Sequence, residues 1–240
     1  ENIRPKSVAR EMFESFRSFA DYIRDYELHR SEGLLLRHLS GVHKVLTQTV
    51  PDLVKTDPVR ELELYLGTMI RQVDSSLLDE WERLRNPRYQ RVHSPSAPPT
   101  PQPETPPDVT QDLRTFTAAI RNRIFMFLRA LVIHDPEAAL ALLDTPARPD
   151  GSTWTPDSLR ADFEAYLSAH QRLCLDPNAR NHRHTYVIQD QPPFSWRVQQ
   201  MLIDPQESND WVAEFQIDLA KSRQTGDPAL LLLRLGPLVF

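Results

Sequence analysis

The stretch Ser31-Glu32-Gly33-Leu34-Leu35-Leu36-Arg37-His38-Leu39-Ser40 opens the segment around which the rest of the chain is organised. Ser31 is a favoured residue at a helix N-cap, and the acidic Glu32 suits the positive end of a helix. Apolar residues then recur at spacings of three and four, which is typical of the buried side of a helix: Leu35, Leu39, Val42 and Leu46. The pattern predicts one long helix that ends near Val50, because Pro51 disfavours helical geometry in the residue before it.

Gly33 is unusual one turn inside this predicted helix. An interior glycine costs about 0.5–1 kcal/mol relative to alanine, so its presence predicts a close approach by another backbone. Arg37 follows four residues later and therefore falls on much the same face. A small residue and a long cation on one face suit a helix with a polymer running past it. The alternative is a tight helix–helix crossing with Arg37 in a surface ion pair, and the pattern by itself favours that alternative.

Composition predicts a soluble cytoplasmic protein. The 240 residues are enough for one large or two ordinary domains. No apolar run approaches the roughly 20 residues that span a bilayer, and no signal peptide is present, so we expect no membrane association. The single cysteine, Cys174, excludes an internal disulfide and fits a reducing compartment. Because the first residue is Glu1 rather than Met, we expect a piece of a longer protein.

Charge is unevenly distributed along the chain. The net charge is −5; residues 1–91 hold 15 Lys/Arg and 15 Asp/Glu, whereas residues 92–240 hold 13 and 18. Residues 1–91 are therefore neutral overall, and residues 92–240 are acidic. No strongly basic field exists to bind nucleic acid by charge alone, so any such contact has to be local.

Residues 1–91 are predicted to form an all-helical bundle. A helix or a broken pair of helices covers Pro5 to about Leu28, with Ser18 as an internal cap and Asp21 in the first turn after it. The long helix follows, a third begins at Pro58, and a short fourth runs over residues 76–86. Residues 92–109 are predicted to be a linker, because 7 of the 21 prolines fall within residues 94–107. A proline-rich ligand for a partner is the alternative reading of that run.

Residues 110–240 are predicted to form an α+β domain. Three helices come first: Leu113–Leu131 with Asp108 and Gln111 as its capping pair, Pro136–Leu143, and one capped by Thr155. Four strands follow, over Arg183–Gln189, Trp196–Ile203, Trp211–Lys221 and Ala229–Leu235. Their short connections indicate an antiparallel meander, and the order of elements predicts helices packed on one face of a curved, cone-like sheet.

Parts of the front half resemble the C-terminal helical domain of DExH-box RNA helicases of the superkiller and exosome-associated type. The likeness is carried by Ser18–Ile23, by Ser31–Arg37 and by Met69–Val73. More closely, Arg30–Arg37, Val73–Trp81 and Trp196–Gln200 resemble an uncharacterised C-terminal extension of bacterial DEAD/DEAH helicases, so this second likeness spans nearly the whole chain.

This resemblance implies that the helix from Ser31 is a ratchet helix beside the channel for single-stranded RNA or DNA. Arg37 would contact the strand through phosphate or by stacking on a base, with His38, Gly41 and Lys44 near that face. Arg71 would be a second contact, or alternatively an ion pair with Asp74 or Glu32. The sequence departs from the eukaryotic pattern over Leu39–Gly41, where that family often carries charged residues.

By element order, the back half is similar to the cone-shaped nuclear transport factor two-like fold, which hosts enzymes, binders and interaction modules. Such a cone would offer seven aromatic and histidine residues to a pocket, although residues of these types more often form ordinary core. The candidate pocket residues are Trp154, Tyr166, His170, His184, Tyr186, Trp196 and Trp211. His182 and His184 alone are a weak metal signal, so no metal site is predicted.

Two hypotheses follow. The first is a non-catalytic accessory region of an ATP-dependent helicase, with motor domains in cis as partners and a back domain that docks a protein or a second copy. No phosphate loop is present, so ATP and Mg²⁺ would belong to the motor domains, and no cofactor or catalytic residue is predicted here. The second hypothesis is a small-molecule-binding or enzymatic cone fold, which requires a deep pocket with converging polar groups.

Overall fold

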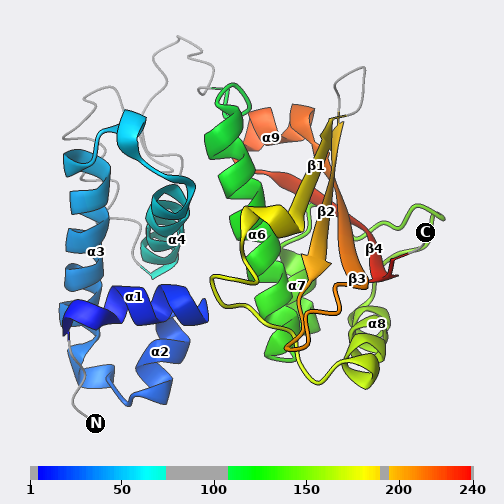
Figure 1. Cartoon of the computed structure of the whole chain (residues 1–240), viewed down its shortest axis with the longest axis horizontal. Coiled ribbons are helices and arrows are strands. Elements are labelled where there is room, and N and C mark those ends of the chain that lie inside the picture. The colour runs from blue at the N-terminus through cyan, green and yellow to red at the C-terminus, as the bar shows by residue number, and fades with distance from the viewer. Residues whose placement is uncertain (1–4, 74–107, 190–194, 239–240) are drawn as a thin grey trace, which may run out of the picture. The chain divides into compact units, whose positions relative to one another are not determined.

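A computed structural model of the chain describes residues 5–73, 108–189 and 195–238. The chain divides into two compact units, Glu1–Thr105 and Pro106–Phe240, which are described separately below (Figure 1). The predicted fourth helix over residues 76–86 and the proline-rich run over residues 94–107 lie outside the described residues.

The first unit is helical throughout its described part. It contains α1 (Pro5–Ser15), α2 (Phe19–Asp25), α3 (Glu32–Thr49) and α4 (Asp57–Val73), with short 3-10 turns η1 (His29–Ser31) and η2 (Asp52–Val54). The predicted break between α1 and α2 is observed at Phe16, whose φ of 49° ends the first helix. Ser18 then caps α2 by accepting a hydrogen bond from the Asp21 amide at 3.2 Å, as predicted.

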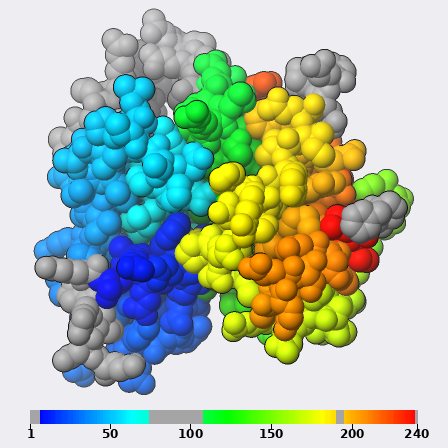
Figure 2. All heavy atoms as spheres, viewed as in Figure 1, coloured from blue at the N-terminus to red at the C-terminus, as the bar shows by residue number. Residues whose placement is uncertain are grey.

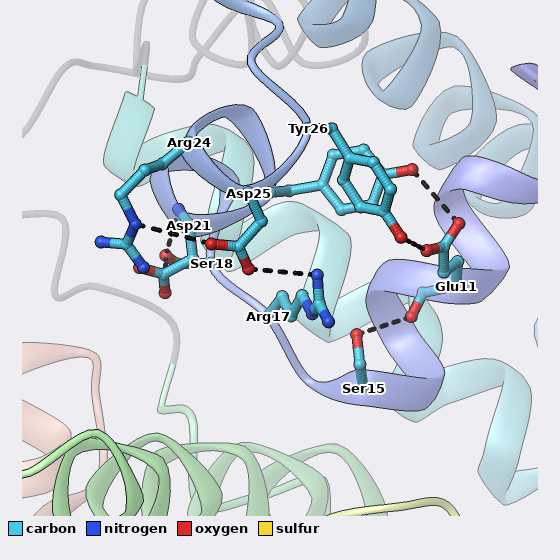
Figure 3. Close-up of polar contacts among 9 residues, drawn as sticks. Glu11, Ser15, Arg17, Ser18, Asp21, Arg24, Asp25 and Tyr26 are labelled. Carbon is cyan, nitrogen blue, oxygen red and sulfur yellow. Dashed lines mark hydrogen bonds and ion pairs between the residues drawn. The ribbon is translucent and has the colours of Figure 1, made fainter. Parts of the chain in front are cut away.

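A shared carboxylate joins α1 to α2 (Figure 3). Glu11 accepts hydrogen bonds from the hydroxyls of Tyr22, at 3.3 Å, and Tyr26. Tyr22 is fully buried, and burial together with the Glu11 charge raises the pKa of its hydroxyl. Arg17, in the connection between α1 and α2, also forms an ion pair with Asp25 at the end of α2, with 3.1 Å between guanidinium nitrogen and carboxylate oxygen. These contacts fix the angle between two helices that are each too short to be stable alone.

Helices α3 and α4 pack side by side, and α1 contacts both. The apolar stripe predicted for α3 is partly right, because Leu35 and Leu39 are buried together with Leu36, whereas Val42 and Leu46 are only half-buried. The main core residues of α4 are Tyr65, Leu66, Met69 and Ile70.

Of two local predictions around the start of α3, the first was right in part and the second was wrong. Ser31 holds the N-cap position, but its side chain makes no capping hydrogen bond. Gly33 is exposed, and a Cβ built on it meets nothing within 4 Å, so no backbone among the described residues approaches it. The close contact occurs instead at Gly67 of α4, where a Cβ would lie 3.0 Å from Nε2 of His43 in α3.

The second unit combines helices with a four-stranded sheet, which confirms the predicted α+β class. Its first helices are α6 (Leu113–Val132), α7 (Pro136–Ala141) and α8 (Pro156–Ala169). A short turn η3 (His182–His184) leads into strands β1 (Thr185–Gln189), β2 (Ser195–Leu202), β3 (Trp211–Asp218) and β4 (Ala229–Pro237). The strands pair antiparallel in the order β1-β2-β3-β4, so the predicted meander is confirmed (Figure 1).

Several boundaries differ from those predicted; the first strand, for example, begins at Thr185 and not at Arg183, because the turn η3 occupies His182–His184. The third strand does not continue to Lys221: it ends at Asp218, whose carboxylate accepts from the Lys221 amide at 2.9 Å and caps a further helix, α9 (Leu219–Thr225). Helix α6 is capped by Asp112, which accepts from the amides of Arg114 and Thr115, and not by the predicted Asp108 and Gln111 pair.

The core of the second unit lies between α6 and one face of the sheet, called here the inner face. Its strand positions are Trp196 and Val198 in β2, Phe215 and Ile217 in β3, and Leu230 and Leu232 in β4, all at most 5% exposed. From α6, Phe116 packs edge-on against Trp196 at 5.5 Å, and Phe127 does the same against Phe215. Because successive side chains of a strand point to opposite faces of the sheet, every second residue of these strands packs against α6.

Candidate functional site

The side of α3 that faces away from α4 forms a strip of seven exposed residues, called here the outer face of α3. Its members are Gly33, Leu34, Arg37, Gly41, Lys44, Val45 and Gln48. They recur at spacings of three, four and seven, which places them on one side of the helix. Two members are cations and none is acidic. The helix contributes to the visible surface of the first unit as the light-blue atoms of Figure 2.

Arg37 lies in the middle of this strip. Among the described residues it forms no hydrogen bond and no ion pair, so the predicted alternative of a surface ion pair is not realised there. A Cβ on Gly33 or on Gly41 would meet nothing within 4 Å, so the helix backbone is open to an approaching chain at both positions. His38 is half-buried beside the strip, whereas Arg71 is exposed near the end of α4.

Of the seven candidate pocket residues in the second unit, the fold brings three together at the C-terminal end of α8. Tyr166 is fully buried there, with its ring 4.9 Å from His170 and 5.5 Å from Trp211. His170 is the C-cap residue of α8, and Trp211 is the first residue of β3. Burial and the nearby Asp204 raise the pKa of Tyr166, which keeps its hydroxyl neutral.

The other four candidates lie apart from this group. Trp154 is a core residue that donates from Nε1 to the Leu232 carbonyl at 2.8 Å. Trp196 packs on Phe116 inside the sheet–helix core. His184 and Tyr186 flank the start of β1, with Tyr186 53% exposed on the other side of the sheet. The inner face of the sheet is filled by its own side chains, which gives the small-molecule hypothesis no support on that side.

Two carboxylates complete the group around His170, and the sequence did not single them out. Asp204 Oδ2 lies 3.6 Å from Nδ1 of His170, and Asp210 Oδ1 lies 3.0 Å from Nε2. Both aspartates belong to the connection between β2 and β3, where acidic residues are common in turns. Asp204 followed by Pro205 reads as a turn start, so only the fold reveals its proximity to a histidine more than thirty residues earlier.

Asp204 is held charged despite its burial. Its side chain is 1% exposed, and burial alone would raise its pKa. The amides of Gln206 and Ser208, which donate to it at 2.7 and 2.9 Å, outweigh that effect with help from His170, so the pKa of Asp204 lies below its ordinary value. The carboxylate is therefore a fixed negative charge beside the imidazole.

The single cysteine lies close to this group. The Cys174 amide donates to the Ile203 carbonyl at 2.8 Å, directly before Asp204. Burial and the charge of Asp176 raise the pKa of the Cys174 thiol. Thiolate is the nucleophilic form, so this environment disfavours Cys174 as a catalytic nucleophile.

Comparisons with known proteins give a family and no activity. No curated protein and no solved structure matches the chain. In the part of the chain that the structure describes, none of the helices is long and apolar enough to cross a membrane. A family described as "Domain of unknown function (DUF3516)" matches residues 1–235. Since that match covers almost the whole sequence, the chain belongs to the DUF3516 family.

Proposed function

We propose that this chain is a non-catalytic accessory region of a cytoplasmic ATP-dependent helicase, in which the outer face of α3 guides single-stranded RNA or DNA. The motor domains, which would bind ATP and Mg²⁺, are its partners in the same polypeptide. The second unit serves as a docking or dimerising module. The sequence resemblance to helicase C-terminal regions supports the class of protein, and the geometry of α3 supports the contact.

The observation that carries the proposal is the composition of the outer face of α3. Arg37 and Lys44 lie seven residues apart, about 10 Å along the helix axis at a rise of 1.5 Å per residue. This spacing lets the two cations neutralise different phosphates of one strand. Leu34 is 72% exposed beside them and offers an apolar contact for an unstacked base.

The small net charge of the first unit sets the expected strength of nucleic-acid binding. The residue counts give the first unit almost no net charge, so binding depends on a few local contacts. Each phosphate contact made to a single strand contributes about 0.7 to the slope of log K against log salt. We therefore expect weak binding by this chain alone, with a shallow salt dependence that corresponds to about two contacts.

The test is binding of fluorescein-labelled single strands of about 12 nucleotides, poly-U and poly-dU, followed by fluorescence anisotropy at about 50 mM salt. The variant Arg37→Ala should weaken binding at least about fivefold and lower the salt slope by about 0.7. Arg10→Ala is the matched control: Arg10 is an exposed cation of α1, paired with Glu14 at 2.6 Å and remote in sequence from the outer face of α3. That control should bind like the unmodified protein.

Two results would contradict the proposal. If Arg37→Ala binds as tightly as the unmodified chain, α3 is not the contact. If Arg10→Ala and Arg37→Ala weaken binding equally, the effect reflects net charge and not the outer face of α3. If Arg37→Ala alone weakens binding, a preference between poly-U and poly-dU assigns RNA or DNA as the strand, because these two polymers differ only in the 2′-hydroxyl.

A further inference from the structure

We propose that His170 and Asp210 bind a divalent transition-metal ion at the C-terminal end of α8, with Asp204 orienting the imidazole. This site lies entirely in the second unit and is independent of the proposed nucleic-acid contact. The sequence predicted no metal site, because the ligands come from segments that only the fold brings together.

The first argument is the state of Nε2 in His170. The side chain is 7% exposed, and Nε2 itself is buried. It lies 3.0 Å from Asp210 Oδ1, yet the angles do not make a hydrogen bond, so this buried nitrogen has no hydrogen-bond partner among the described residues. A buried polar atom without a partner is costly, and a bound cation would remove that cost.

The second argument is the geometry of the possible ligands. One ligand atom from each of His170, Asp204 and Asp210 lies within 4.8 Å of the other two. Metal–nitrogen and metal–oxygen bonds are about 2.1 Å long, so two ligand atoms 3.0 Å apart subtend about 90° at a shared ion. That angle matches neighbouring ligands of an octahedral site. Asp210 is 56% exposed, which leaves room for water to complete the coordination.

The third argument is the role of Asp204 on the far side of the ring. Asp204 Oδ2 lies 3.6 Å from Nδ1, whereas Asp210 Oδ1 lies 3.0 Å from Nε2, so the two carboxylates contact different nitrogens of the ring and only Asp210 is next to the unpartnered one. A carboxylate behind a metal-binding histidine is the usual second partner in such sites. Among the described residues, neither carboxylate pairs with Lys or Arg, so two negative charges face one imidazole.

The mixed ligand set indicates the class of ion. Imidazole nitrogen suits Zn²⁺, Ni²⁺ and Co²⁺, whereas Mg²⁺ prefers oxygen ligands alone. We therefore expect Zn²⁺ and Co²⁺ to bind and Mg²⁺ to bind at least about tenfold more weakly.

The test uses the full chain without an affinity tag, titrated with Zn²⁺ by calorimetry and with Co²⁺ by visible absorption. We expect about one equivalent of Zn²⁺ to bind saturably and to raise the melting temperature. Asp210→Asn should weaken binding at least about tenfold. Asp210→Asn is the decisive variant, because Asp210 is exposed and its replacement leaves the core intact. A folded His170→Gln variant should show no Co²⁺ absorption band.

Two matched controls separate this site from adventitious binding. Asp227→Asn removes an exposed loop carboxylate elsewhere in the unit, and His182→Ala removes an exposed histidine. Both should bind Zn²⁺ like the unmodified chain. The proposal is overturned if no saturable binding is found, if Asp210→Asn binds normally, or if His182→Ala abolishes binding.

Discussion

Gly67 determines how closely α3 and α4 approach each other. The imidazole of His43 occupies the space where a side chain would begin, with Nε2 3.0 Å from the ideal Cβ position. The sequence contains both this glycine and Gly33 in predicted helices, and periodicity does not distinguish them. Gly33 was predicted to mark the close contact, but only the pairing of the two helices shows which glycine faces a neighbour.

Two alanine substitutions test this contact. Gly41→Ala should stabilise the protein by about 0.5–1 kcal/mol, because its Cβ meets open space and alanine favours the helix. Gly67→Ala should instead destabilise it by about 1 kcal/mol, because overpacking outweighs the same gain in helix propensity. The measurement is the free energy of unfolding in urea, followed by circular dichroism. Equal shifts in the two variants would show that His43 moves aside without cost.

The candidate site also shows that the sequence identifies residue types but not which of them meet in the fold. Tyr166, His170 and Trp211 were singled out for their chemistry, and they do lie together. The two aspartates were missed because a loop carboxylate carries no sequence pattern of its own. Their position depends on where the connection between β2 and β3 passes the end of α8, which follows from strand register and not from local sequence.

At the scale of elements, α9 shows how a periodic pattern can extend too far. Apolar residues occupy every second position of β3, and the buried Leu219 continues this pattern. The alternation of apolar and polar residues by itself therefore favours a longer strand. Asp218 caps the helix that begins there, and Gly226 ends it with a φ of 77°. Both features are visible in the sequence as a cap residue and a terminal glycine, and together they are a stronger signal than one further apolar position.

The short turn η2 between α3 and α4 is fixed by a buried lysine. The Lys55 side chain is 3% exposed and contacts Asp52 and Glu63, each at 2.8 Å. This anchor holds the turn while Leu53, which is 99% exposed, points into solvent. Burial by itself would lower the pKa of Lys55, but the two carboxylates outweigh it and raise the pKa.

Replacing Lys55 by methionine should cost about 1–3 kcal/mol of unfolding free energy near neutral pH, since charged hydrogen bonds are lost. The folded pKa is raised, so this contribution is present below the unfolded pKa of about 10.4 and is lost as the pH rises through the folded value. Urea unfolding of the unmodified protein and of Lys55→Met should therefore converge at strongly alkaline pH. A constant difference across the whole range would contradict this account.

At the scale of the whole molecule, the fold class and the order of the described helices and strands followed from sequence patterns, with the exception of α9. Cap residues, prolines at helix starts and apolar periodicity placed the helices, and alternation placed the strands of the meander. The resemblance of the second unit to a cone-shaped fold stays a prediction. The proposed function rests on resemblance, because the sequence carries no motif whose residues define a reaction.

The distribution of charge predicts where a bound strand will be found on the full chain. The back of the sequence is acidic and should repel a polyanion, whereas the outer face of α3 is the proposed contact. Crosslinking with an oligonucleotide that contains 4-thiouridine, followed by mass spectrometry, should yield modified peptides from residues 32–49. Crosslinks confined to residues 108–238 would place the binding surface in the other unit.

The environment of Cys174 has a practical consequence. A thiol-specific reagent has a single target in this sequence, and the raised pKa of this half-buried thiol makes it slow to react. The rate of alkylation therefore reports changes in the exposure of the Cys174 side chain, in the unmodified protein and without an added probe. Slower alkylation in the presence of Zn²⁺ would report that the neighbouring loop had become more rigid.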